Sequence, residues 1–208
     1  MTKTYKRYYR WLGWFVRFIF HVKVVGYENI PKKDGFLVCS NHISGTDPVK
    51  ICCAMKGHQV FYMAKKELFS KPILGKVITS LGAFPIDRQN VGIGSIKHII
   101  SLLESGESAG LFPQGTRHKG VDPRTTAVRS GAGMIAVRSG ADVLPVFIGT
   151  KDNRHKMFRK SVIIIGKPMN FKDRETKDGE TQSELYADIT NEIFGEICKL
   201  GEEHGYLK

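Results

Sequence analysis

The sequence predicts an α/β fold: a single mixed, mostly parallel β-sheet of about seven strands, flanked by helices. Seven short apolar runs are typical of strands, and amphipathic helical patterns fall between them. The chain has 208 residues, of which 41% are apolar, and this suffices for one sizeable globular domain. Strands that alternate with helices indicate a sheet whose two faces are both covered.

The expected elements follow one another with short connections. The runs that predict strands cover residues 21–26, 36–40, 60–64, 83–86, 109–112, 143–149 and 161–166. The patterns that predict helices cover residues 48–56, 70–81, 92–105, 129–139 and 183–200. Pro145 interrupts one strand, and a buried strand tolerates proline only at an edge or a bulge. Ligands of such sheets usually gather at strand ends.

Positive charge is concentrated in the first four-fifths of the chain. Residues 1–170 contain 27 Lys or Arg and 10 Asp or Glu, whereas residues 171–208 contain 5 and 10. This excess indicates an anionic partner, which could be a lipid headgroup, nucleic acid, an acidic carrier protein or a phosphorylated substrate. No recognised nucleic-acid motif accompanies the charge, so we expect no nucleic-acid partner.

The N-terminal segment combines positive charge with aromatic side chains. Residues 3–24 contain six Lys or Arg and no acidic residue. Interleaved with them are Trp11, Trp14, Phe15, Phe18 and Phe20. Such a mixture suits a membrane interface, and a run this short, with Arg17 inside it, lies on a bilayer rather than crossing it. We therefore expect residues 1–20 to form an amphipathic membrane-contact helix. The alternative is a helix docked on its own core.

The cysteines and histidines indicate neither disulfides nor a metal. Cys39, Cys52, Cys53 and Cys198 show no CxxC spacing and no paired framework, so we expect reduced cysteines that pack as small core residues. The seven histidines are scattered without ligand spacing, so we predict no metal site.

Residues 41–48, NHISGTDP, place a histidine and an aspartate five positions apart between a predicted strand and a predicted helix. On a continuous helix the two side chains would lie roughly 140° apart, so His42 and Asp47 can meet only across a turn. We expect Asp47 at the helix N-cap and Pro48 at the first helical position. The two residues are either a catalytic pair or a capping aspartate beside an unrelated loop histidine.

Three further segments could serve a site at the strand ends. Residues 81–88 read LGAFPIDR, residues 111–120 read LFPQGTRHKG, and residues 143–148 read VLPVFI. In the second segment glycine allows close backbone approach to a phosphate, threonine offers a hydroxyl, and arginine presents a planar fork of donors. Taken alone, the GTR sequence predicts no more than a surface turn with a solvated arginine.

Together and in this order, the four segments resemble the motifs of the glycerophospholipid acyltransferase family, most closely those of its 1-acyl-sn-glycerol-3-phosphate acyltransferase type. The motifs are NHxxxxD, GAFPIDR, FPxGTR and a VLPV strand. The connecting segments YMAKKELF (62–69), RSGA (129–132) and IGKP (165–168) are also similar to those of the family. The resemblance implies that residues 21–208 form an acyltransferase domain.

The resemblance also implies a role for each motif. His42 is the general base for a glycerol hydroxyl that attacks an acyl thioester directly, and Asp47 holds the imidazole tautomer. The phosphate of the acceptor is bound by Arg88, Gly115, Thr116 and Arg117. The acyl-chain side is supported by Val143 and Pro145. The third motif usually reads FPEGTR, so Gln114 departs from it by the loss of a charge, which leaves the acceptor preference open.

The resulting hypothesis is an enzyme that acylates 1-acyl-sn-glycerol 3-phosphate (lysophosphatidic acid) to phosphatidic acid. It implies acyl-CoA or acyl carrier protein as co-substrate and no bound cofactor. It also implies peripheral or monotopic contact with the anionic, cytoplasmic face of a membrane. Two alternatives stay open: the same chemistry on another lysophospholipid or on glycerol 3-phosphate, and a non-catalytic protein that binds anionic lipid.

Overall fold

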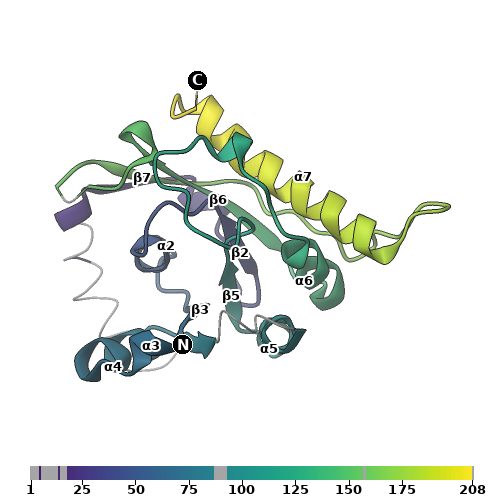
Figure 1. Cartoon of the computed structure of the whole chain (residues 1–208), viewed down its shortest axis with the longest axis horizontal. Helices are drawn as coiled ribbons and strands as arrows, with labels where there is room; N and C mark the ends of the chain where they lie inside the picture. Colours follow the sequence, from purple (N-terminus) through teal and green to yellow (C-terminus); the bar gives the residue numbers. More distant parts are fainter. Residues whose placement is uncertain (1–4, 6–13, 15–17, 87–92, 157, 208) are drawn as a thin grey trace.

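The computed structural model describes residues 5, 14, 18–86, 93–156 and 158–207, and within them one seven-stranded sheet in the order β1-β7-β6-β2-β5-β3-β4 (Figure 1). The strands are β1 (Val22–Val25), β2 (Leu37–Ser40), β3 (Val60–Lys65), β4 (Ala83–Ile86), β5 (Ser108–Leu111), β6 (Val143–Thr150) and β7 (Ser161–Ile165). Every pairing is parallel except that of β6 with β7. The predicted mixed, mostly parallel sheet is therefore confirmed.

The helices cover the two faces of the sheet. They are α2 (Asp47–Ala54), α3 (Lys66–Phe69), α4 (Pro72–Ser80), α5 (Ile93–Glu104), α6 (Gly131–Ser139) and α7 (Gln182–Glu203). Helices α5, α6 and α7 lie on one side of the sheet and α2 on the other (Figure 1). Helix α3 has no counterpart among the predicted helices, because a single turn is too short to show a helical period.

Strand β6 shows how the sequence produces this layering. Its successive side chains alternate between the two faces. Val143 and Phe147 join the apolar cluster beneath α5, α6 and α7, whereas Leu144 and Val146 join the cluster beneath α2. All eight residues of β6 are buried, as expected of a strand inside a covered sheet.

The long helix α7 follows its predicted pattern. Leu185, Ile189, Ile193 and Ile197 recur every four residues and are all buried. A capping box starts the helix, because the Thr181 hydroxyl accepts from the Glu184 N–H and the Glu184 carboxylate accepts from the Thr181 N–H. The four cysteines are free and buried, as expected.

Pro145 lies in an internal strand, at a local irregularity of pairing. Val146 pairs with Ile165, but the next bridge joins Val143 to Met169, so the register shifts by one residue between them. Such a shift is a β-bulge. The Pro145 carbonyl still accepts the Gly166 N–H at 2.9 Å, so the strand loses only the donor that proline lacks.

Parallel pairing brings several loops to one edge of the sheet. Strands β2, β5 and β6 are mutually aligned, so the loops that follow Ser40, Leu111 and Thr150 all emerge at the C-terminal edge. The predicted phosphate-binding Arg88 lies outside the described residues, in the segment after β4. Ligands usually bind at this edge in α/β sheets, and the predicted site residues His42, Asp47 and Arg117 belong to its loops.

The predicted membrane-contact segment is described only in part. Tyr5 is fully buried, and its hydroxyl donates to the His58 carbonyl at 2.9 Å. Trp14 and Phe18 stack on each other with ring centroids 5.7 Å apart, yet they are 67% and 61% exposed. Trp11, Phe15 and Arg17 lie outside the described residues. Within the described part of the chain, no helix combines the length and apolar character needed to cross a bilayer.

The close packing of α6 against α7 leads to a testable prediction at Gly133. A Cβ at Gly133 would lie 2.1 Å from the Tyr186 carbonyl oxygen, so both helix backbones would have to move. We expect Gly133→Ala to destabilise the protein by about 1–3 kcal/mol, measured by urea unfolding. The control is Gly195→Ala on the exposed side of α7, where a Cβ meets nothing within 4 Å. That change should instead stabilise by up to about 1 kcal/mol. Equal effects at the two sites would contradict the close approach.

Candidate active site

The loop between β2 and α2 is organised around the Asp47 carboxylate. Its Oδ2 accepts from His42 Nδ1 at 2.9 Å, from the Ile43 N–H at 2.7 Å and from the Ser44 N–H at 2.6 Å. Asp47 is fully buried. Burying a carboxylate is costly unless it is hydrogen-bonded, so these three hydrogen bonds offset the cost of burying Asp47. The turn predicted from the spacing thus joins the two side chains.

The predicted N-cap role of Asp47 is wrong. Thr46 is the N-cap and Asp47 is the first helical residue, followed by Pro48. The Asp47 side chain caps no helical N–H, because it turns back to bind donors that precede the helix. Its charge still lies in the first turn of α2, where the helix dipole favours an anion.

Neighbouring loops fix the backbone of His42. The His42 N–H donates to Gln114 Oε1 at 2.8 Å, and the His42 carbonyl accepts the His118 N–H at 2.8 Å. Before it, the Asn41 side chain bonds both the N–H and the carbonyl of Ile148 in β6. The backbone around His42 is therefore held by two segments that are distant from it in sequence, the loop after β5 and strand β6.

An aromatic stack fixes the imidazole ring itself. Phe112 stacks on His42 with ring centroids 3.9 Å apart and planes 14° apart, and Tyr62 stacks on Phe112 at 5.6 Å. The Tyr62 ring lies over Gly110, where a Cβ would come within 2.1 Å of it. The stack shields one face of the imidazole from water and restricts its rotation. With Nδ1 held by Asp47, Nε2 is left as the nitrogen that can take a proton.

A buried lysine extends this network beyond the predicted pair. Lys50, one turn along α2, is completely buried, with its Nζ 3.6 Å from Asp47 Oδ1 and 2.7 Å from His155 Nδ1. Burial lowers the pKa of Lys50, and the Asp47 carboxylate partly opposes this effect. Burial and the Lys50 ammonium together lower the pKa of His155 to about 4. His155 is therefore neutral at neutral pH and accepts a hydrogen bond from Lys50.

The GTR loop lies beside the histidine loop and forms a cavity with it. The cavity holds about 310 Å³ and is lined by Ile43, Ser44, Gly45, Arg117, Lys119 and His155. The Arg117 guanidinium passes so close to Gly45 that a Cβ there would lie 3.2 Å from its Nη1. Gly115 adopts a left-handed φ of 68°, which favours glycine. The structure thus brings Arg117 to the loop that carries His42, and leaves Gly115 and Thr116 exposed beside it.

The residues predicted to support an acyl chain lie elsewhere. Val143 begins β6 and pairs with Leu37 at the start of β2, so it lies at the opposite end of the strands from His42. Its side chain belongs to the core beneath α5, α6 and α7. Pro145 is adjacent to Cys39 of β2 and equally lines no part of the cavity. Their predicted contribution to acyl binding stays a prediction.

Sequence reasoning missed Lys50, Lys119 and His155. A lysine three residues after Asp47, followed by Ile51, Cys52 and Cys53, interrupts the apolar side of the expected helix, and this was an available signal for Lys50. His155 gives no such signal, because it is 105 residues from Lys50. Among the described residues, no group of three or more His, Cys, Asp or Glu could hold a metal ion.

Known proteins share both the sequence pattern and the fold. A family model described as Acyltransferase matches residues 21–149. The 1-acyl-sn-glycerol-3-phosphate acyltransferase of Bacillus subtilis is 36% identical over 154 residues, which are 73% of this chain and 75% of that protein. The protein of the same name from Streptococcus pneumoniae is 33% identical over 180 residues, which are 85% of this chain and 64% of that protein.

A solved structure extends the similarity to most of the chain. The crystal structure of the 1-acyl-sn-glycerophosphate (LPA) acyltransferase PlsC from Thermotoga maritima matches with a TM-score of 0.69 and 25% sequence identity. The match covers 98% of this chain and 77% of that one. The region matched by the family model contains His42, Asp47 and the GTR loop.

The buried lysine makes a prediction about stability. Removing one partner of a buried ion pair leaves the other charge uncompensated. We expect Lys50→Met to destabilise the protein by roughly 3–5 kcal/mol, measured by urea unfolding, because the buried Asp47 carboxylate loses the ammonium that lies 3.6 Å from its Oδ1. Lys56→Met, just beyond α2, is the control, since Lys56 is exposed and lies over the Tyr27 ring. An unchanged free energy of unfolding would show that Lys50 does not stabilise the Asp47 carboxylate.

Proposed function

Because this chain belongs to the acyltransferase family, we propose that it is a 1-acylglycerol-3-phosphate O-acyltransferase that converts lysophosphatidic acid into phosphatidic acid. The observation that carries the proposal is the bond between His42 Nδ1 and Asp47 Oδ2, which lies in the region matched by the family model. The names of the Bacillus and Streptococcus relatives support the choice of acceptor.

In the proposed reaction His42 acts as general base. With Nδ1–H donated to Asp47, Nε2 takes the proton from the free hydroxyl of the acceptor as the hydroxyl oxygen attacks the thioester carbonyl. A tetrahedral intermediate then collapses, its carbon–sulfur bond breaks, and the imidazolium returns the proton to the leaving thiolate. Asp47 stabilises the imidazolium between these two steps without itself taking the proton. The chemistry needs no acyl-enzyme.

The cavity beside His42 supplies charge for the acceptor phosphate. Arg117 and Lys119 are cations in its wall, and the wall includes no acidic side chain. An arginine fork binds phosphate oxygens well. We assign the phosphate to Arg117, with the exposed Thr116 hydroxyl and Gly115 beside it and Arg88 as a further ligand from the segment after β4. The donor is acyl-CoA or acyl carrier protein.

We further propose that residues 1–20 hold the enzyme on a membrane surface, where its acceptor resides. Trp14 and Phe18 expose stacked aromatic rings that would otherwise stay in contact with water. Aromatic rings interleaved with Lys and Arg favour the headgroup region of an anionic bilayer. This contact is peripheral or monotopic.

The first experiment tests reaction, acceptor and base together. Wild type and His42→Ala are incubated with liposomes, lysophosphatidic acid and either acyl-CoA or acyl carrier protein loaded with the same chain, and lipid products are measured by mass spectrometry. We expect phosphatidic acid from wild type and a loss of roughly 10²–10⁴-fold in the variant, since the general base is gone. Folded wild type that makes no phosphatidic acid with either donor would contradict the proposal. Product from another lysophospholipid would instead reassign the acceptor.

The phosphate assignment has its own test. Arg117→Gln should raise the KM for lysophosphatidic acid by roughly 10-fold or more, because a charged hydrogen bond contributes about 1.5–3 kcal/mol. Arg174→Gln is the control, because Arg174 is an exposed arginine that pairs with Glu192 of α7, away from the cavity. An Arg117 variant with the KM of the control would move the phosphate to other ligands.

A further inference from the structure

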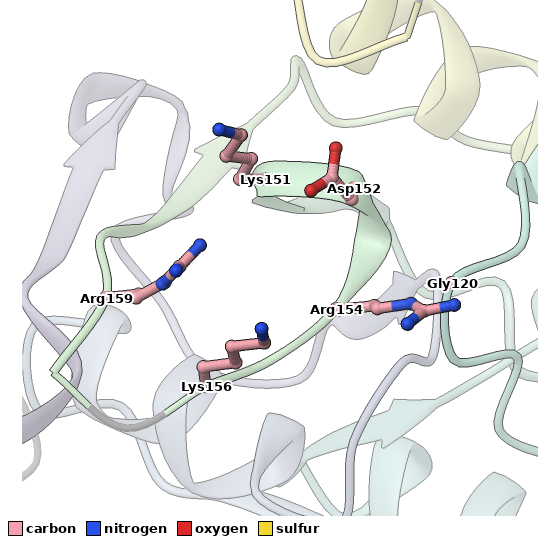
Figure 2. Close-up of a pocket in the computed structure, with 6 residues that line it drawn as sticks. All are labelled: Gly120, Lys151, Asp152, Arg154, Lys156 and Arg159. Carbon is pink, nitrogen blue, oxygen red and sulfur yellow. The ribbon is translucent and has the colours of Figure 1, made fainter.

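The connection between β6 and β7, residues 151–160, surrounds a second cavity. This basic pocket holds about 360 Å³ and is lined by Gly120, Lys151, Asp152, Arg154, Lys156 and Arg159. Figure 2 shows Lys156 and Arg159 directed toward the space that the loop encloses, and Arg154 extended toward Gly120. None of the predicted roles involves these residues.

The basic pocket carries an excess of positive charge. Four of its six residues are cations and one is an acid, and all four cations are exposed. Among the described residues, no ion pair joins any of these cations to a carboxylate. Within the described part of the chain, Asp152 also forms no ion pair. Two of the four cations, Lys156 and Arg159, point into the space that the loop encloses (Figure 2). Such a cluster of cations around a cavity fits an anion that carries several oxygens, such as a phosphate group.

The backbone of the loop is held in place rather than extended into solvent. The Gly120 N–H donates to the Asn153 carbonyl at 2.8 Å, which ties the loop to the segment after the GTR sequence. The Arg154 side chain packs so closely on Gly120 that a Cβ there would lie 2.7 Å from its Nε. Between Arg154 and Lys156, His155 points the other way and lines the cavity between the His42 loop and the GTR loop, hereafter the catalytic cavity. The basic pocket and the catalytic cavity are therefore neighbours that share one loop.

Exposed aromatic rings lie next to the basic pocket. Phe158, between Lys156 and Arg159, is 64% exposed. Its N–H donates to the Ile19 carbonyl at 3.0 Å, which places it beside the segment that carries the exposed Phe18. The Phe20 ring packs edge-on against His155 of the same loop. A free soluble phosphate would be bound by the cations alone and gives no reason for these rings, whereas a lipid surface uses both.

We propose that the β6–β7 loop is a second membrane-contact element, in which the basic pocket binds the phosphate of an anionic phospholipid headgroup and Phe158 enters the interface. The proposal deepens the membrane contact assigned above to residues 1–20 and rests on it. It adds to the preference for anionic bilayers that the Lys and Arg of the N-terminal segment supply. It also orients the catalytic cavity, since His155 belongs to the same loop.

Vesicle sedimentation tests the headgroup site without any acyl donor, so that the result does not depend on turnover. The variant is Arg154→Gln/Lys156→Gln/Arg159→Gln. The matched control, Lys32→Gln/Lys33→Gln/Lys172→Gln, removes the same charge from exposed residues at the opposite edge of the sheet. With phosphatidylcholine vesicles containing phosphatidylglycerol, the loop variant should lose roughly 100-fold in partitioning, about fivefold for each cation, and the control far less. With phosphatidylcholine alone, the two should bind equally.

A fluorescent reporter tests insertion of the loop directly. Trp11→Phe and Trp14→Phe remove both native tryptophans, and Phe158→Trp then supplies a single one. On anionic vesicles that contain brominated phospholipid, we expect its emission to shift to the blue and to be quenched. A tryptophan placed instead at Lys172, an exposed position at the opposite edge of the sheet, should remain unquenched.

Three results would overturn the proposal. Equal losses in the loop variant and the control would mean that general charge, not the pocket, binds the vesicle. An unquenched tryptophan at position 158 would place the loop away from the lipid. Calorimetric binding of coenzyme A that is lost in the loop variant, with vesicle binding intact, would assign the pocket to a soluble acyl donor. If the wild-type protein bound anionic vesicles but transferred no acyl group, the proposed function would be wrong and the membrane contact of the loop would still hold.

Discussion

One carboxylate oxygen, Asp47 Oδ2, determines the arrangement of the whole site. Three donors converge on it: the His42 ring and the backbone N–H groups of Ile43 and Ser44. The same atom therefore sets both the path of the loop and the orientation of the imidazole. A buried charge is tolerated only when it is hydrogen-bonded in this way. If the loop moved, the Asp47 carboxylate would lose these bonds while it stayed buried, at a large cost in free energy. The rest of the site is built around that constraint.

The sheet supplies the frame that this constraint requires. Parallel strands deliver the histidine loop, the GTR loop and the β6–β7 connection to one edge, and side-chain bonds then join them. Asn41 continues the ladder to β6 through its amide, and Gln114 bridges the histidine loop to Thr126. These polar groups are buried and satisfied, so they add specificity of position as well as stability.

Gln114, which departs from the usual motif, has a structural reason to be uncharged. Its Oε1 accepts the His42 N–H, and its Nε2 donates to the Thr126 hydroxyl at 2.7 Å. A glutamate could perform the first function but not the second, because an ionised carboxylate has no proton to donate. The amide therefore holds the same backbone N–H without burying a second charge near Asp47. This account concerns loop geometry and does not depend on the choice of acceptor.

Local patterns predicted most of the fold, and the reasons are visible in particular elements. The four-residue period of α7 and the apolar runs of the seven strands predicted these elements correctly, because both patterns come from side chains that are buried in the core. The turn joining His42 to Asp47 followed from helix geometry. The direction of the Asp47 side chain did not, since an aspartate at the start of a helix can bond to donors on either side of it. The contact between Lys50 and His155 could not be predicted, because His155 lies in the β6–β7 connection, 105 residues from Lys50, and no local pattern relates the two.

The reversed direction of β7 has an evolutionary consequence. Because β7 runs antiparallel to β6, residues 151–160 form a hairpin connection that leaves and re-enters the sheet at the same edge. A parallel β7 would have needed a crossover of a dozen or more residues packed on a face of the sheet. A hairpin can instead lengthen, shorten or change composition at a small entropic cost and without rebuilding the core. Changes in this one short segment can thus alter the rim of the site while the loop that holds His42 and Asp47 stays fixed.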